Sequence, residues 1–211
     1  MASAHPPQDW LSSYAAGAAS DGVALLVAAH VTYCPRCRAA ICAAERLGGG
    51  FFAWQTPSPM SEGALEATLS RLDASERPFG DAETAGVSLP RPVLEAAGAP
   101  IETLRWRFRM PGVHEVDLAA EGAEKASLLR VRPGTRVPAH THTGTEATLV
   151  LRGALIDRGR VFRPGDVAVA TEADDHHPEA GPGEDCVCLA VLAGGLRFTG
   201  AFGRALNIFA E

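Results

Sequence analysis

Apolar residues recur at helical spacing through the first part of the chain. Residues 7–47 are rich in alanine, leucine and valine, and polar or helix-breaking residues interrupt them at 20–22 and 34–35. The pattern predicts three short helices that are separated at these two points. Glycines 48–50 are expected to end the third helix, because glycine is favoured just beyond a helix C-terminus.

A fourth helix is predicted from Ser61 to about Asp73. Ser61 is a suitable N-cap. Leu65, Leu69 and Leu72 fall at positions i, i+4 and i+7, which places them on one face of the helix. This apolar stripe either packs within its own domain or binds a partner protein.

From residue 104 onward the pattern changes to short segments rich in valine, leucine, arginine and threonine, between glycine and proline turns. Such segments are typical of β-strands. We expect strands at 104–109, 126–131, 147–152, 167–170 and 186–192. Regular short strands with frequent turns favour a small β-barrel or a double-sheet roll.

Between these two patterns, residues 75–92 are rich in proline, glycine, alanine and acidic residues and show little periodicity. This composition is typical of a linker. At 211 residues, the chain is long enough for two small domains. We therefore predict a two-domain α plus β protein, with a helical domain at 1–76, a linker at 77–93 and an all-β domain at 94–211.

Charge and composition narrow the choice of partners. The net charge is -6, the basic residues are scattered, and Lys125 is the only lysine. This distribution argues against direct binding of nucleic acid. Residues 1–10 lack the basic start and apolar run of a signal peptide, and no apolar segment reaches the roughly 18 residues of a membrane helix. We expect a cytoplasmic protein without membrane contact.

The first candidate site is an HxxxCxxC motif formed by His30, Cys34 and Cys37. It joins the end of one predicted helix to the start of the next, because Pro35 suits a first helical turn and disfavours helical geometry at the residue before it. The helix dipole favours thiolate charge at that N-terminus. Two thiolates and an imidazole suit tetrahedral Zn²⁺.

A tetrahedral zinc site needs a fourth ligand. His5, the only other histidine in the helical half, lies in a lead-in that can fold across the motif, and Cys42 is the alternative. The CxxC cysteines could instead form a redox dithiol or simply be buried. A redox CxxC normally follows a strand in a βαβ unit, and the pattern here predicts no such unit.

The second candidate site lies in the β half. His140 and His142 are two residues apart on an expected strand and share a face, and Glu146, a further even step away, can join them. Imidazole and carboxylate ligands would serve Zn, Mn, Fe, Ni or Cu. With Gly134 and Gly153, these residues match the pattern GxxxxxHxHxxxExxxxxxG. In this they resemble the first motif of the cupin barrel, a double-stranded β-helix or jelly roll.

The second cupin motif would be expected to supply a last histidine. The Pro-Gly-Asp turn at 164–166 marks its place, but no histidine follows three residues later, and His176 and His177 come only after a further strand. Both histidines are candidates for the last ligand. Cys186 and Cys188 alternate on an expected strand and therefore share a face. They are either sensing thiols beside the metal or two core cysteines.

The two motifs together resemble the ChrR-like anti-sigma factors along almost the whole chain. The resemblance implies an N-terminal four-helix, zinc-binding anti-sigma domain that sequesters an ECF-type (group IV) sigma factor of RNA polymerase and so represses transcription. It implies a C-terminal cupin-like domain that is needed to release the sigma factor under oxidative stress such as singlet oxygen. The release would follow from oxidant chemistry at the cupin metal or at the paired cysteines.

The resemblance also implies which residues act. The implied zinc ligands are His5, His30, Cys34 and Cys37. The implied ligands of the cupin metal, which is Zn or another divalent transition metal, are His140, His142, Glu146 and His176. No catalytic residue is implied, and the stripe of Leu65, Leu69 and Leu72 becomes a candidate partner-binding surface.

Two other functions fit the same residues. A metal-dependent cupin oxygenase or isomerase with an accessory zinc domain would hold a redox-active metal in an open site. A cupin module that binds a small ligand would control the sigma factor without oxidation. The resemblance favours a regulatory protein over an enzyme.

Overall fold

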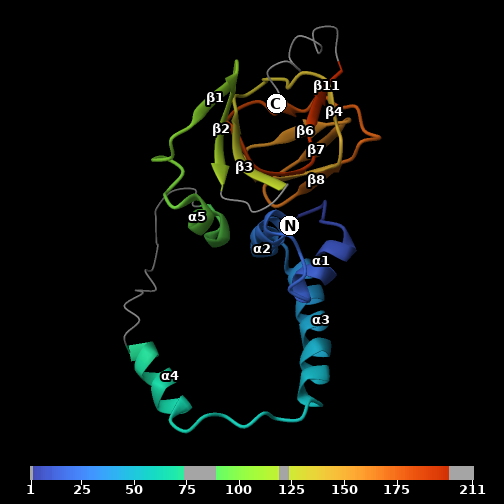
Figure 1. Ribbon diagram of the computed structural model, residues 1–211. Helices are drawn as coiled ribbons and strands as arrows, with labels where there is room; N and C mark the ends of the chain where they lie inside the picture. The colour runs from blue at the N-terminus through green and yellow to red at the C-terminus, as the bar shows by residue number, and fades with distance from the viewer. Residues whose placement is uncertain (1, 74–88, 119–123, 200–211) are drawn as a thin grey trace.

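The computed structural model describes residues 2–73, 89–118 and 124–199. Within these residues, helices come first along the chain and strands follow (Figure 1). The helices are α1 (Gln8–Ala15), α2 (Asp21–Tyr33), α3 (Pro35–Ala53), α4 (Ala64–Asp73) and α5 (Arg91–Ala97). In the described part of the chain, no helix has both the length and the apolar character that crossing a membrane requires.

The first three helices form where the sequence predicts them, but α3 is longer than expected. It continues through glycines 48–50 and ends at Ala53, so the prediction that these glycines end the helix is wrong. None of the three has the positive φ that lets a glycine terminate a helix. Each instead keeps helical geometry at a cost of about 1 kcal/mol relative to alanine.

The fourth helix, α4, begins at Ala64, shortly after the expected N-cap Ser61, and lies apart from α1, α2 and α3 (Figure 1). The predicted linker at 77–93 falls mostly outside the described residues. Its last residues are folded, because Leu89 is buried and α5 begins at Arg91. The described N-terminal region thus has five helices where the sequence predicted four.

Eleven strands follow within the described residues. They are β1 (Arg107–Met110), β2 (Val113–Leu118), β3 (Glu124–Val131), β4 (His140–His142), β5 (Thr145–Arg152), β6 (Leu155–Asp157), β7 (Arg160–Phe162), β8 (Val167–Ala170), β9 (Glu179–Ala180), β10 (Cys186–Ala193) and β11 (Leu196–Phe198). The five predicted strands correspond to β1, β3, β5, β8 and β10. Most of the strands that the pattern did not predict have only two or three residues, too few to show a period.

The strands form a six-stranded sheet in the order β1-β2-β3-β10-β5-β8, a three-stranded sheet β7-β6-β9 and a two-stranded sheet β11-β4. Neighbouring strands are antiparallel. We call this region the β domain. It brings the segment after β8 against β4, where His140 and His176 exchange backbone hydrogen bonds of 3.0 Å.

The central strands of the six-stranded sheet are buried on both faces, which explains the continuous apolar sequence of β10. On one face Leu128, Leu149 and Leu189 pack with Leu26 of α2 and Val93 of α5. On the other face a second cluster contains both cysteines of β10. The helices and the β domain therefore share a hydrophobic core, and α2 lies against the sheet (Figure 1).

A carboxylate from the β domain also holds the first turn of α2. Glu124 accepts hydrogen bonds from the Ser20 hydroxyl and from the Gly22 amide, each of 2.9 Å. A negative charge is favourable at this end of a helix, because unpaired amides and the helix dipole point toward it. The orientation of α2 is thus set by the β domain.

Candidate metal centres

The first cluster forms where α2 ends and α3 begins. His30 lies in the last turn of α2. Cys34 is the N-cap of α3, and its sulfur accepts the Cys37 amide at 3.5 Å, while Pro35 occupies the first helical position. The chain reversal that Pro35 predicts is therefore present, and it turns both sulfurs toward the end of α2.

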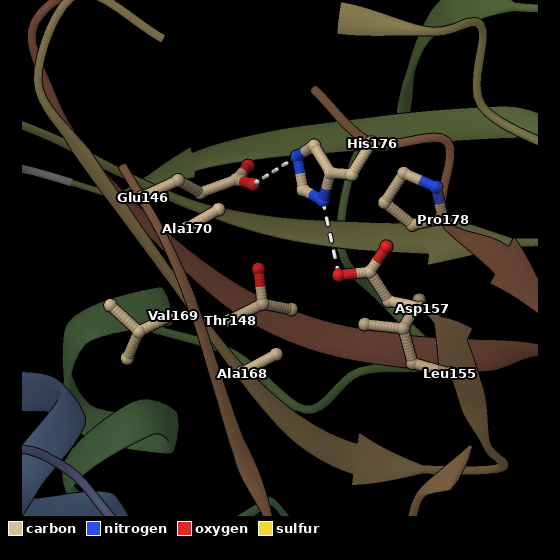
Figure 2. A pocket seen from close by; sticks show the side chains of 9 residues that line it. All are labelled: Glu146, Thr148, Leu155, Asp157, Ala168, Val169, Ala170, His176 and Pro178. Atoms are coloured by element: carbon tan, nitrogen blue, oxygen red, sulfur yellow. Dashed lines mark hydrogen bonds and ion pairs between the residues drawn. The ribbon is translucent and has the colours of Figure 1, made fainter. Parts of the chain in front are cut away.

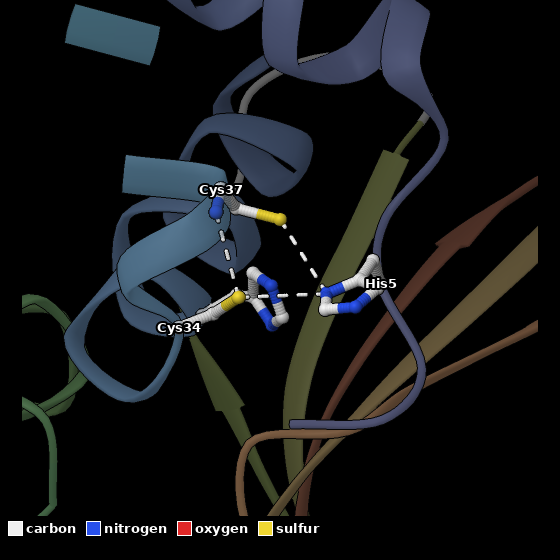
Figure 3. Close-up of side chains that lie close together, drawn as sticks. His5, Cys34 and Cys37 are labelled. Carbon is white, nitrogen blue, oxygen red and sulfur yellow. Dashed lines mark hydrogen bonds between the residues drawn. The ribbon is translucent and has the colours of Figure 1, made fainter. Parts of the chain in front are cut away.

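Four side chains meet at this reversal. The ligand atoms of His5, His30, Cys34 and Cys37 all lie within 4.8 Å of one another. His5 Nδ1 is 3.5 Å from the Sγ atoms of Cys34 and Cys37 (Figure 3). The alternative fourth ligand, Cys42, is exposed on α3.

The state of His30 fits a metal ligand. Its Nδ1 lies 2.8 Å from the carbonyl oxygen of Gly165, so this nitrogen carries the proton and donates it. The other nitrogen, Nε2, is buried and has no hydrogen-bond partner among the described residues. Burial lowers the pKa of His30, which keeps the imidazole neutral and its lone pair available. A buried acceptor that faces two thiols would be satisfied by a cation.

The two thiols supply the remaining donors of the first cluster. Burial and the neighbouring Cys34 raise the pKa of Cys37 to about 11, so the thiol is protonated at neutral pH in the bare protein. A bound transition metal would reverse this, because a coordinating thiol loses its proton. Two sulfur and two nitrogen donors form the set that tetrahedral zinc sites use.

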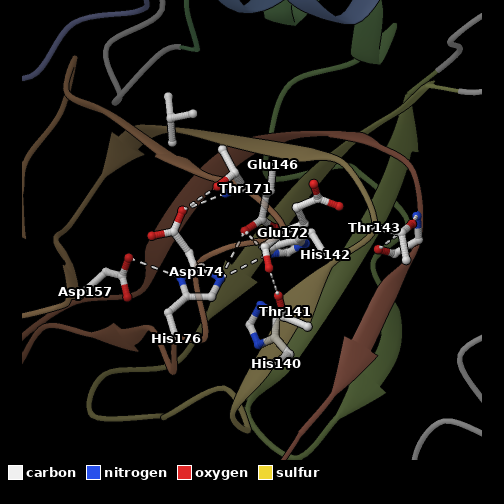
Figure 4. A network of polar contacts seen from close by, with 12 residues as sticks. His140, Thr141, His142, Thr143, Glu146, Asp157, Thr171, Glu172, Asp174 and His176 are labelled. Atoms are coloured by element: carbon white, nitrogen blue, oxygen red, sulfur yellow. Dashed lines mark hydrogen bonds and ion pairs between the residues drawn. The ribbon is translucent and has the colours of Figure 1, made fainter.

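The second cluster lies within the β domain. His140 and His142 come from β4, Glu146 from β5, and His176 from the loop between β8 and β9, and their ligand atoms all lie within 4.8 Å of one another. His142 Nε2 is 3.0 Å from His176 Nε2, and the Glu146 carboxylate is 3.4 Å and 3.6 Å from these two nitrogens (Figure 4). His177, the alternative last ligand, is exposed.

Groups behind this cluster orient its histidines. His140 Nδ1 is 2.7 Å from the Pro138 carbonyl, and His176 Nδ1 is 3.1 Å from the buried carboxylate of Asp157 (Figures 2 and 4). Each contact directs Nε2 of the ring toward the cluster, as is common for histidines that bind metals. The role of Asp157 was not predicted from the sequence. Its only signal was an acidic residue at the end of a strand too short to predict.

Without a metal, burial and the neighbouring groups shift the pKa values of the side chains in this cluster. Burial raises the pKa of Glu146 to about 7. Burial, together with His140 and His176, lowers the pKa of His142 to about 4. Burial alone would lower the pKa of His176, but the hydrogen bond to Asp157 and the charge of that carboxylate outweigh it and raise the pKa. Three imidazoles and a carboxylate so disposed can hold a divalent transition metal.

The cavity beside the second cluster is small. Glu146, Asp157 and His176 line it, together with side chains of β5, β6 and β8 (Figure 2). Its volume is about 10 Å³, which holds about one water molecule. An organic substrate would not fit there without rearrangement of the domain.

Cys186 and Cys188 of β10 lie deep in the β domain. Both are buried, and their sulfurs are 3.4 Å apart. Cys188 pairs with Val150 of β5, and Leu192 pairs with Glu146 in the same ladder, so the cysteines are on the same face of the sheet as that ligand. They are thus both core residues and neighbours of the second cluster.

The reactivity of the cysteines should differ sharply. The pKa of the Cys188 thiol lies well above its ordinary value, because of its hydrogen bond with Cys186 and because of burial. Since the thiolate is the reacting form, we expect iodoacetamide at pH 7.5 to label the exposed Cys42 and to leave Cys186 and Cys188 unmodified in the folded protein. Peptide mass spectrometry, with the unfolded chain as control, would measure this. Rapid labelling of Cys188 in the folded chain would contradict it.

Comparisons with known proteins agree with these observations. The family model of the ChrR cupin-like domain matches residues 95–194. The anti-sigma-E factor ChrR of Cereibacter sphaeroides is 35% identical over 205 residues, which are 97% of this chain and 96% of that protein. A chain of the crystal structure of Rhodobacter sphaeroides SigE in complex with the anti-sigma ChrR matches with 33% identity and a TM-score of 0.76, covering 91% of this chain and 99% of that one.

The fold and the two clusters define a class of protein in which a helical N-terminal region with a His/Cys cluster is joined to a cupin-like β domain with a His/Glu cluster. The identity and the coverage of both chains then place it more narrowly. The chain belongs to the ChrR family.

Proposed function

We propose that this protein is an anti-sigma factor that sequesters an ECF-type sigma factor in the cytoplasm and so represses transcription. The observation that carries the proposal is the match over 91% of the chain to the crystal structure of SigE with the anti-sigma ChrR. A match that spans both domains supports the same use of both. Residues 1–76 would be the anti-sigma domain, with α1–α4 as its four helices, and residues 94–211 a cupin domain whose sheets close into a barrel.

The surface for the sigma factor is the end of α3 together with α4. Large apolar side chains are exposed along this segment, at 49% to 79% of their full area. They are Leu47, Phe51, Phe52, Trp54, Met60, Leu65, Leu69 and Leu72. Such a concentration of exposed apolar and aromatic residues is typical of a protein-binding surface. The stripe predicted on the fourth helix is therefore proposed to face the partner.

The metal of the first cluster is proposed to be zinc, bound by His5, His30, Cys34 and Cys37. The donor set, its burial and the orphaned Nε2 of His30 support this. A zinc ion there would fix the end of α2 and the start of α3. The second cluster is proposed to hold Zn or another divalent transition metal through His140, His142, Glu146 and His176.

The β domain is proposed to control release. Oxidative stress such as singlet oxygen would alter the second centre, or the nearby Cys186 and Cys188, and the altered β domain would change its packing on α2. The shared core supports this, because α2 contacts the β domain along its length and carries a ligand of the first centre in its last turn. The cavity of about 10 Å³ favours such a regulatory role over an oxygenase or isomerase.

Binding should depend on α4. We expect the full chain to co-purify with an ECF sigma factor of the same organism when the two are co-expressed. Replacing Leu65 and Leu69 with aspartate should weaken that complex roughly a thousandfold, since each buried apolar anchor contributes about 2 kcal/mol or more. Isothermal calorimetry on the purified proteins would measure the change.

The matched control is Val161→Asp, which places the same charge on an apolar residue that is 50% exposed in the β domain. This variant should bind normally. Equal loss of affinity in both variants, or full affinity in the α4 variant, would disprove the proposed surface.

A further inference from the structure

The turn between β7 and β8 reaches out of the β domain and touches the first metal centre at two points. The carbonyl oxygen of Gly165 accepts the Nδ1 proton of His30 at 2.8 Å. The next residue, Asp166, accepts hydrogen bonds from the backbone of the segment that precedes His5. Two of the four proposed ligands are thus held by one turn of the other domain.

Asp166 is buried, and its carboxylate binds the backbone amides of the N-terminal segment. Asp166 is 4% exposed, and its carboxylate accepts hydrogen bonds from the amides of Ser3 and Ala4, the latter at 2.9 Å, and from the amide of Arg163 at 2.9 Å. The Val167 amide then donates to the Ala4 carbonyl at 3.1 Å. The N-terminal segment is therefore fastened alongside the start of β8, and this fastening positions the His5 ring over the two thiols (Figure 3).

The contact at Gly165 leaves no room for a side chain. Its φ is +93°, and a Cβ atom there would lie 2.6 Å from Cβ of Tyr33, the last residue of α2. Real Cβ atoms do not approach so closely, so the turn and the helix end would have to separate. The hydrogen bond to His30 depends on this close approach.

Strand β8 connects this turn to the second centre. It begins at Val167, directly after Asp166, and ends at Ala170, which pairs with the ligand Glu146 on β5. The four residues of β8 span roughly 13 Å at 3.3 Å per residue. A hydrogen-bonded strand is stiff along its length, so a shift of Glu146 would be passed to the turn.

We propose that the β7–β8 turn is a positioning element of the first metal centre, and that through β8 it makes metal retention there depend on the state of the second centre. This inference rests on the proposed zinc site. Groups that orient metal-bound histidines typically change metal affinity by 10- to 100-fold when they are altered. The turn would act as such a group from the neighbouring domain.

The test uses the full chain loaded with Co²⁺ in place of zinc. Only the first centre has thiolate ligands, so its sulfur-to-cobalt charge-transfer absorption reports that site alone. The measured quantity is the rate at which this absorption disappears after a chelator is added. Gly165→Ala, which drives the turn away from Tyr33, should lose cobalt about ten times faster than wild type or more.

Gly159→Ala is the matched control. Gly159 lies between β6 and β7 with φ of +73°, so alanine is strained there as well, but no atom lies within 4 Å of the added Cβ. This variant should release cobalt at the wild-type rate. Equal rates in the Gly165 and Gly159 variants would overturn the inference, because backbone strain alone would then account for any change.

Two more variants separate the parts of the inference. Asp166→Ala removes the fastening of the N-terminal segment and should also speed cobalt loss, whereas Asp166→Asn, which keeps one acceptor oxygen, should lie between it and wild type. Glu146→Ala should speed loss at the first centre, although it changes only the second. Unchanged loss in Glu146→Ala would overturn the dependence on the second centre.

The wild-type spectrum separates these failures from failure of the zinc site itself. A missing thiolate absorption in cobalt-loaded wild type would overturn the proposed zinc site and this inference with it. A normal spectrum with unchanged release in Gly165→Ala and Asp166→Ala, at wild-type melting temperature, would overturn this inference alone.

Discussion

Replacing Cys34 and Cys37 together with serine is expected to release the metal of the first centre and to abolish binding of the sigma factor. Serine is a poor ligand for a soft metal, and structural zinc sites contribute on the order of 10 kcal/mol to the folding of small domains. The core that surrounds the two sulfurs is small and contains only a few other buried apolar side chains, Leu11, Val27 and Ile41 among them. Without the metal it would be too weak to keep α1 and α3 in place.

Metal analysis and calorimetry on the purified proteins would measure both effects, and we expect affinity for the sigma factor to fall at least a hundredfold. Cys42→Ser is the matched control, because Cys42 lies on the same helix but is exposed. It should keep its metal and its affinity. A double variant that binds the sigma factor like wild type would show that the first centre does not support the partner-binding surface.

The second large effect is expected on the release of the sigma factor under oxidant. In zinc-containing buffer, which keeps the first centre loaded, changing His140, His142 and Glu146 together to alanine should leave sigma-factor binding intact but prevent release by singlet oxygen. The three side chains supply most of the second cluster, so no metal would remain to react. The proposed surface for the sigma factor lies on α3 and α4, away from these three residues, and would be unchanged.

Release would be measured as free sigma factor after illumination of the purified complex with a photosensitiser. His177→Ala is the matched control, since His177 is exposed beside the buried His176 and should release normally. Melting curves of the full-length triple variant would show whether it is folded. If the folded triple variant released the sigma factor at the wild-type rate, the second centre would have no part in sensing.

Several features of this protein were determined by local sequence. The helices α1, α2 and α3 and the eight-residue strands β3, β5 and β10 follow from the apolar pattern, because each element buries one or both of its faces. The HxxxCxxC and HxH motifs set their own geometry, because ligands a few residues apart on a helix end or a strand must lie together. Glycines 48–50 show the limit of such rules. Glycine permits a helix end but does not require one, and here the helical hydrogen bonds continue past it.

Only the tertiary structure decided which distant residues close each cluster. His5 reaches the thiols because Asp166 fastens the segment before it, and His176 faces the second cluster because its backbone pairs with His140. Adjacent His177 makes no such pairing in the described structure and is exposed. Asp157 contacts the ligand His176 from β6, a strand that is too short to show a pattern in the sequence.

The contact between the helical region and the β domain was also decided by the tertiary structure. The sequence pattern placed a linker between two units, whereas α2 shares its core with the six-stranded sheet and donates a hydrogen bond from His30 to the Gly165 carbonyl. The two motifs could therefore be predicted from the sequence, because each consists of residues that are close together along the chain. The link between them came from the fold, because contacts across more than a hundred residues leave no period in the sequence that could predict them.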